Sequence, residues 1–333
     1  MFHNVNIINT GIYHPSCAIH NSFFIEHFNK MNIKVDKLMN TLGREVRYLA
    51  KEGTESSITM ATEAAKEVLR KSCLDAKNID MLVFVSDTPE YTYPSNALII
   101  QNQLGAKNAH VVFDMNSNCI GMLSALDNVS RYLQANPSIK YALITSGVMV
   151  SNIVRKDDPI TYPNFSDGGA AIILKNEKSE DRIGFIDANY YTDSSLYYTV
   201  NYPAVGFSHI FDNKISDEDK KLKFLSHDVS YFSDIWKDTI KSLLDRNKLD
   251  INEIDHYIFS QFNKSEIEET LVKLKVNLDK YTFVGYKYGY TGATSPIFAL
   301  DEALKTNVVK RGMKVIFCSV GIGFTMCAVL YQF

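Results

Sequence analysis

The sequence contains an internal repeat, and a unit that is used twice constrains the fold more than any other feature of this chain. Three segments of the first half recur in the second half in the same order, at offsets of 173 to 175 residues. They are NIDMLVFVS at 78–86, MLSALDNVSRYL at 122–133 and YALITSG at 141–147, which match EIDHYIFSQ at 253–261, PIFALDEALKT at 296–306 and KVIFCSV at 314–320. Because matches in one order at nearly constant spacing indicate a duplicated structural unit, we predict two halves related by a pseudo-twofold axis.

Within each half, strand-like and helix-like patterns alternate along the chain. The helical pattern at 55–74 precedes the apolar strand MLVFV at 81–85, and this alternation is typical of an α/β protein with largely buried sheets. A length of 333 residues permits about two domains. We predict one half over residues 1–175 and the other over 176–333, in which 176–235 is an irregular segment that helps to line the ligand entrance.

Composition excludes several classes of protein. Lys and Arg total 35 against 38 Asp and Glu, which leaves no basic excess for nucleic acid. The longest apolar runs are interrupted by Gly, Ser and Thr, so we predict buried strands and no membrane span. The N-terminal sequence lacks the features of a signal peptide, and the 5 Cys include no CxxC pair. We therefore predict a cytoplasmic protein with reduced thiols and without a metal site.

Cys119 is the candidate nucleophile. It follows a predicted strand at 110–114 and begins an apolar helix, where exposed N–H groups and the helix dipole are expected to lower the pKa of a thiol. Gly121 is expected to let a substrate approach closely. The alternative interpretation is a buried Cys that serves as a small apolar filler. We adopt that interpretation for the other cysteines of the middle and C-terminal segments, which are Cys73, Cys318 and Cys327.

Several segments make the chain resemble the 3-oxoacyl-acyl-carrier-protein synthase III family of the thiolase superfamily over nearly its whole length. They are INTGIYHPS, LGREVRYLA, YPSNALIIQNQLGAKNAHVVFDMNSNCIGMLSAL, FSDGGAAIIL, IDHYIFSQFNK, YGYTGATSP and GIGFTMCAVLYQF. The resemblance implies a thiolase-like, five-layered α-β-α-β-α sandwich. It also implies that Cys119 is acylated by an acyl-CoA or by the phosphopantetheine arm of an acyl carrier protein, with no permanently bound cofactor. In that family the acyl group is then condensed with malonyl on acyl carrier protein.

The resemblance also shows where this chain departs from the family. The histidine of a motif resembling PHQAN aligns with Ser260, and the asparagine of a motif resembling HGNTS aligns with Tyr290. In the family these side chains bind the malonyl thioester carbonyl and stabilise an enolate. Ser and Tyr hydroxyls donate hydrogen bonds, but neither is a base near neutral pH as imidazole is. The family's oxyanion hole uses backbone N–H groups, here those of Cys119 and Ile322, and such donors survive a change of side chain.

The residues that bind the acyl donor are altered as well. The adenine-stacking tryptophan of the family aligns with Lys37, and a family arginine aligns with Pro159, near Arg155. We take Lys37, Arg155 and Asn263 as candidate donor-binding residues. The alternative interpretation of Arg155 is that it and its basic neighbour are loop side chains solvated at the surface. Binding of a carrier protein would need a basic rim, for which the candidates are Lys37, Arg44 and Arg47.

By the same resemblance, we expect a dimer. Family members pair through strands that follow the nucleophile helix, here near YALITSG at 141–147. Tyr93 aligns with an aromatic residue that closes the partner's acyl pocket, and the alternative is an ordinary aromatic residue of an interface or core. Two functions remain open. The first is an acyltransferase in which Cys119 passes an acyl group to a carbon nucleophile, or to an amine or hydroxyl in a specialised pathway. The second is a catalytically degenerate subunit that forms a heterodimer with an active paralogue.

Overall fold

The computed structural model describes residues 2–333, in which nine strands form one sheet in the order β11-β12-β13-β8-β1-β7-β6-β4-β5 and four short strands form two further two-stranded sheets. The strands of the first half are β1 (Phe2–Tyr13), β4 (Met81–Val85), β5 (Val111–Met115), β6 (Tyr141–Val148) and β7 (Gly168–Ser179). Those of the second half are β8 (Gly184–Thr192), β11 (His256–Phe259), β12 (Lys314–Gly321) and β13 (Thr325–Gln332). The two sets meet only where Val5 of β1 pairs with Gly184 of β8, so they behave as two sheets.

The pairing directions confirm the predicted duplication. In the first half β4 and β6 are parallel, while β6–β7 and β7–β1 are antiparallel. In the second half β11 and β12 are parallel, while β12–β13 and β13–β8 are antiparallel. Each matched sequence segment therefore occupies the same place in its own half.

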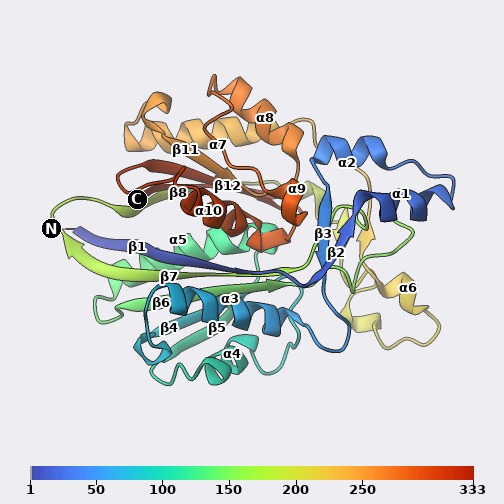
Figure 1. Cartoon of the computed structure of the whole chain (residues 1–333), viewed down its shortest axis with the longest axis horizontal. Coiled ribbons are helices and arrows are strands. Elements are labelled where there is room, and N and C mark those ends of the chain that lie inside the picture. Colours follow the sequence, from blue (N-terminus) through green and yellow to red (C-terminus); the bar gives the residue numbers. More distant parts are fainter. Residues whose placement is uncertain (1) are drawn as a thin grey trace.

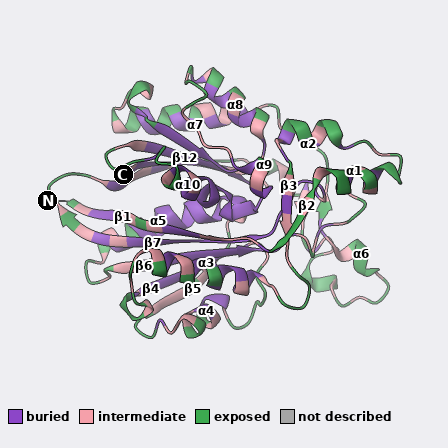
Figure 2. Ribbon diagram, viewed as in Figure 1, coloured by how far each residue is buried: buried purple, intermediate pink, exposed green. Residues whose placement is uncertain are grey.

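Helices cover both faces of each sheet and produce the predicted five-layered sandwich (Figure 1). The middle layer holds α5 (Gly121–Ala135) and α10 (Ser295–Lys305), which pack against strands of both halves. The outer layers hold α3 (Ser57–Lys71) and α4 (Asn96–Leu104) on one side, and α7 (Phe232–Asn247) and α8 (Lys264–Lys273) on the other. Figure 2 shows that burial is deepest along the strands and the two middle helices.

Helix α3 begins at a capping box and lies unusually close to its sheet. Ser56 and Thr59 each satisfy a backbone N–H of the other, which fixes the start of the helix. Glycine is required beneath it, because a Cβ at Gly147 would come within 1.8 Å of the Ser57 carbonyl oxygen and one at Gly169 within 2.2 Å of the Met60 oxygen. The small residues of YALITSG and SDGG therefore set the distance between the helix and the sheet.

The segment 176–235 is more regular than predicted. It contains β8, a core strand that is the counterpart of β1, and the predicted boundary at residue 175 falls inside β7. The irregular part begins only after Thr192. It consists of η3 (Ser194–Leu196), β9 (Val200–Asn201), η4 (Phe207–His209), α6 (Asp217–Lys220) and β10 (Lys223–Phe224). Two tyrosines at the end of β8 resemble the aromatic loop that follows, which hid the strand in the sequence.

A small lobe beside the sheets contains β2 (Cys17–His20), β3 (Val46–Leu49), α1 (Asn21–Asn29) and α2 (Asp36–Leu42). The remaining short elements are α9 (Gly285–Tyr288), η1 (Ala76–Asn78), η2 (Asn118–Ile120), η5 (Ile251–Glu253) and η6 (Gly292–Thr294). Within residues 2–333, every helix is too short or too polar to span a bilayer. The same residues contain no cluster of His, Cys, Asp and Glu able to hold a metal ion.

Candidate functional site

Cys119 lies in a short turn between β5 and α5. Asn118 adopts a positive φ of 50°, and its N–H donates to the side-chain oxygen of Asn116 at 2.9 Å, which closes the turn after the strand. The carbonyl oxygen of Cys119 accepts a hydrogen bond of 3.0 Å from the hydroxyl of Ser319 on β12. The nucleophile of the first half is therefore held by a strand of the second half, and only 5% of its surface is exposed.

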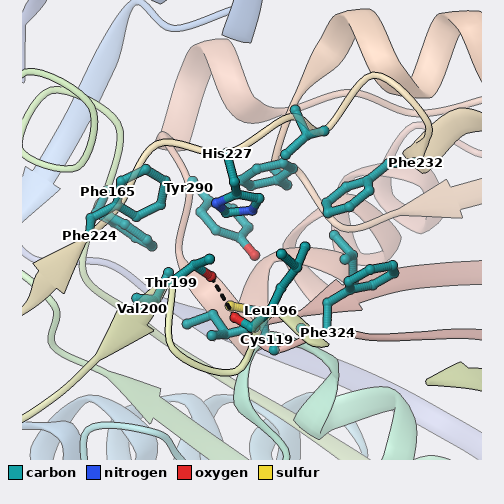
Figure 3. Close-up of a pocket in the computed structure, with 16 residues that line it drawn as sticks. Cys119, Phe165, Leu196, Thr199, Val200, Phe224, His227, Phe232, Tyr290 and Phe324 are labelled. Carbon is teal, nitrogen blue, oxygen red and sulfur yellow. Dashed lines mark hydrogen bonds between the residues drawn. The ribbon is translucent and has the colours of Figure 1, made fainter. Parts of the chain in front are cut away.

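The thiol opens onto a narrow apolar cavity of about 80 Å³ (Figure 3). Both halves contribute to the cavity wall, and so does the irregular segment that follows β8. The lining residues are Cys119, Phe165, Leu196, Thr199, Val200, Phe224, His227, Val229, Phe232, Phe262, Tyr290, Val320, Gly321, Ile322, Gly323 and Phe324. Neither Lys nor Arg is among them, so this wall is suited to an uncharged chain.

The pKa of the Cys119 thiol is raised to about 12, whereas the helix start had predicted a lowered value. Burial of the thiol is the main cause, and the negative charge of Asp87 adds to it. A contact with the Tyr290 hydroxyl acts in the opposite direction. The prediction was wrong because the cavity removes water from the thiol, and this desolvation outweighs the backbone N–H groups of the turn.

Tyr290 and Ser260 lie together beside the nucleophile. The N–H of Tyr290 donates to Asn164 at 3.3 Å and its carbonyl accepts from Ser166 at 2.9 Å, which anchors the residue before η6. Its hydroxyl faces Cys119, and burial raises the pKa of Tyr290 well above its ordinary value. Ser260 follows β11 directly and is fully buried. Its hydroxyl oxygen makes no hydrogen bond of good geometry within residues 2–333. It nevertheless lies near Tyr290 and lowers the pKa of that phenol.

Asp87 is a charged neighbour that the sequence analysis did not identify. It follows β4 after Ser86, and its Oδ1 atom is buried without a hydrogen-bond partner in the described chain. Burial raises the pKa of Asp87 to about 6, and its charge raises the pKa values of both Cys119 and Tyr290. The recognisable signal was an acidic residue at the carboxyl end of a buried parallel strand, where ligands bind in α/β proteins.

Ile322 lies in the turn from β12 to β13 that borders the cavity. Its backbone N–H makes no hydrogen bond with residues 2–333, so a donor is free in the wall beside Cys119. A Cβ added at the neighbouring Gly321 would lie 3.3 Å from the carbonyl oxygen of Ser117. This turn therefore lies closely against the turn that holds the nucleophile.

The two sequence profiles that match the chain are both described as 3-oxoacyl-[acyl-carrier-protein] synthase III, one over residues 113–194 and one for the C-terminal part over residues 244–333. A beta-ketoacyl-[acyl-carrier-protein] synthase III of Clostridium novyi (strain NT) is 31% identical over 333 residues, which is 99% of both chains. The chain belongs to the 3-oxoacyl-acyl-carrier-protein synthase III family.

Other synthase III proteins agree with this assignment. The enzyme of Wolbachia pipientis wMel is 30% identical over 328 residues, covering 98% of each chain. The crystal structure of the synthase III from Aquifex aeolicus VF5 superposes with a TM-score of 0.85 at 27% identity, covering 99% of this chain and 100% of that one. The chain is therefore an acyltransferase of the condensing-enzyme class, and the resemblance seen in its motifs is confirmed.

Two of the candidate donor-binding residues of this synthase III homologue lie outside the cavity wall and already have partners. Asn263 caps α8, where its side-chain oxygen accepts from the N–H of Ser265 at 3.0 Å. Arg155 pairs with Asp157 at 2.9 Å and with Asp219 at 3.5 Å beside a surface hollow of about 420 Å³. Phe224 lines both this hollow and the cavity, so the two adjoin.

The predicted basic rim is wrong for two of its three members. Lys37 is exposed on α2, but Arg44 and Arg47 are fully buried. The Arg44 guanidinium donates to Asn164 and to backbone carbonyls that include Gln261. Arg47 donates to Pro163 O and Asn21 Oδ1. Arg44 thus joins the small lobe to the second half, Arg47 joins it to the segment before β7, and neither arginine is available to a carrier protein.

Two further expectations are corrected by the structure. Gly121 serves packing, because a Cβ there would come within 2.5 Å of Val85 Cγ1. Cys73 is exposed, so it does not fill the core, whereas Cys318 and Cys327 are buried.

The sequence analysis did not identify His227, which lies in the irregular segment and lines the cavity. No local pattern distinguished it from the other 7 histidines of the chain.

Proposed function

We propose that Cys119 accepts an acyl group from acyl-CoA or from an acyl carrier protein and then transfers it to a second substrate. The observation that carries the proposal is a buried thiol at the wall of an apolar cavity, on the scaffold of a condensing enzyme. Phe165, Phe232 and Phe324 offer the acyl chain apolar surface. The N–H groups of Cys119 and Ile322 are the proposed donors to the thioester oxygen.

The acceptor is a carbon nucleophile, or an amine or hydroxyl that forms an amide or ester. Ser260 and Tyr290 lie beside Cys119 and supply hydroxyl groups where the resemblance expects histidine and asparagine. Hydroxyls so placed can hold a carbonyl by hydrogen bonds, but they do not replace an imidazole as a base near neutral pH. Standard malonyl condensation is therefore disfavoured, and an amine or hydroxyl acceptor would need a base other than Ser260 and Tyr290.

Mass spectrometry of the intact protein tests the first half-reaction. The protein is incubated with acyl-CoA and acyl-carrier thioesters of increasing chain length, and the mass is recorded with Cys119→Ala as the inactive variant. Cys73→Ala is the matched control, because Cys73 is exposed and distant from the cavity wall. We expect an acyl adduct in the wild type and in Cys73→Ala but not in Cys119→Ala.

The same experiment tests the degenerate-subunit alternative. The raised pKa of Cys119 favours that alternative, because a neutral thiol is a weak nucleophile. If no donor yields an adduct on the protein alone or in the presence of a paralogous synthase, the transferase proposal is wrong.

We further propose that two copies pair through β5. This strand is the edge of the sheet in the first half, whereas β6, named in the sequence analysis, lies between β7 and β4 and cannot pair with a partner strand. Phe113 on β5 is 40% exposed and Tyr93 is 90% exposed, which is unusual for aromatic residues unless a partner covers them. Light scattering should give a dimer that Tyr93→Asp weakens. A monomeric wild type at micromolar concentration would contradict this pairing.

A further inference from the structure

His227 is held above the nucleophile by a short loop between β10 and α7. Its Nδ1 atom lies 3.0 Å from the carbonyl oxygen of Leu225, and its ring lies against Phe224 with centroids 5.9 Å apart. A carbonyl oxygen only accepts hydrogen bonds, so Nδ1 must carry the proton of the neutral ring. The lone pair of the neutral imidazole is therefore on Nε2.

The Nε2 atom has no hydrogen-bond partner in residues 2–333, and the ring lines the same cavity as Cys119 and Tyr290. Figure 3 shows the His227 ring on one side of this cavity and Cys119 on the other, with the Tyr290 hydroxyl between them. The titratable groups that line the cavity are these three; the charge of Asp87 acts on the thiol, and Asp228 is next to His227 in the chain. His227 is the only imidazole in the wall.

We propose that His227 is the general base of the acyl-transfer half-reaction, and that the acceptor is an uncharged amine or hydroxyl. The inference rests on the proposed loading of Cys119. An acyl group on Cys119 has its oxygen at the backbone donors, so the free approach to its carbonyl carbon lies through the cavity toward His227. An acceptor that enters there has its N–H or O–H proton within the region that Nε2 faces.

The bonds and protons of this step balance. As the acceptor N or O forms a bond with the acyl carbon, its proton passes to Nε2 of His227. The carbon–sulfur bond to Cys119 then breaks, and the departing thiolate takes the proton from His227. The products are an amide or ester and the free thiol, and both side chains return to their starting states. No other co-reactant is needed.

The test uses an acceptor of minimal size, so that the natural one need not be known. The protein is loaded with an octanoyl N-acetylcysteamine thioester, freed of excess donor and mixed with hydroxylamine, and loss of the octanoyl mass is followed in time. His227→Asn is the main variant, because its side-chain amide can still donate to the Leu225 carbonyl but has no group at the Nε2 position. We expect loading to persist and unloading to slow by on the order of 100-fold.

His227→Ala adds a signature that a structural role would not produce. Imidazole added to the buffer should restore unloading in this variant, because the vacated site lies at a partly exposed loop. It should have no effect on the wild type or on His209→Ala, the matched control in η4 of the same segment. Circular dichroism establishes that each variant is folded.

The outcomes separate this inference from the proposed function. If the wild type never acquires the octanoyl group, the loading proposal fails and this inference fails with it. If wild type and His227→Asn load and unload at equal rates, and imidazole does not accelerate His227→Ala, only the role of His227 is refuted. Slow unloading that imidazole restores supports it.

Discussion

Replacement of Asp87 by Asn should stabilise the protein at alkaline pH and leave it unchanged at acid pH. Burial raises the pKa of this carboxyl from 3.8 to about 6, so the folded state favours the protonated form. The carboxyl is neutral in both folded and unfolded states only well below its ordinary pKa of 3.8. As the pH rises from 3.8 to about 6, the unfolded state ionises freely while the folded state stays protonated to avoid a buried charge, and stability is lost over this interval.

The size of the effect follows from the shift in pKa. A displacement from 3.8 to about 6 corresponds to roughly 3 kcal/mol of lost folding free energy once the carboxyl is ionised in both states. Asp87→Asn removes the charge and keeps the shape. Urea unfolding at pH 8 should therefore show a gain of about 3 kcal/mol for the variant, while at about pH 2.5, where the carboxyl is neutral in both states, the two proteins should unfold together.

The reactivity of the Cys119 thiol provides a second measurement of the effect of Asp87→Asn. Because the charge of Asp87 raises the pKa of Cys119, Asp87→Asn should speed alkylation of Cys119 by iodoacetamide at pH 8, measured on the isolated peptide. Asp238→Asn, an exposed carboxylate on α7, is the control and should change stability by less than about 0.5 kcal/mol. Equal stability of Asp87→Asn and wild type at pH 8 would refute the account of a desolvated carboxyl.

Three further predictions concern the nucleophile and the core. Tyr290→Phe removes a hydroxyl that lowers the pKa of Cys119, so alkylation of the thiol at pH 8 should slow while the circular dichroism spectrum stays unchanged. Arg44→Ala should cost about 3 to 5 kcal/mol in urea unfolding because buried carbonyls lose their donor, whereas the exposed Lys37→Ala should cost less than about 0.5 kcal/mol. Gly147→Ala should cost at least about 3 kcal/mol by the same assay, because its Cβ would collide with the backbone of α3; a neutral result would show that the helix can shift.

The elements that could be predicted are those whose signal is local. The strand MLVFV and the helix that follows Cys119 have clear apolar periodicity, and both occur where expected. Strand β8 was missed because its tyrosines at 190 and 191, which are both partly exposed, continue into an aromatic loop. The place of Cys119 in a turn after a strand was predictable from the strand, the polar turn and the apolar helix around it.

The electrostatics of the site were not predictable in this way. The sequence around Cys119 indicated a lowered thiol pKa, yet the thiol is buried against groups from other strands, and desolvation reverses the sign. Arg44 and Arg47 were taken as surface residues because charged side chains usually are, but they make buried hydrogen bonds from the small lobe to Asn164 and Pro163, which lie before β7. Desolvation depends on which distant segments cover a group, and no local pattern records it.

The sequence by itself determined the duplicated α/β architecture, the family and the position of the nucleophile, because periodicity, turn residues and motifs are properties of neighbouring residues. Tertiary structure alone decided what surrounds that nucleophile. His227 and Tyr290 lie far apart in the chain and line one cavity, and the charge of Asp87 acts on the thiol there, only after both sheets have packed on the middle helices. The pKa values of Asp87 and Tyr290 depend on that packing, since burial and hydrogen bonding are set by residues remote in sequence.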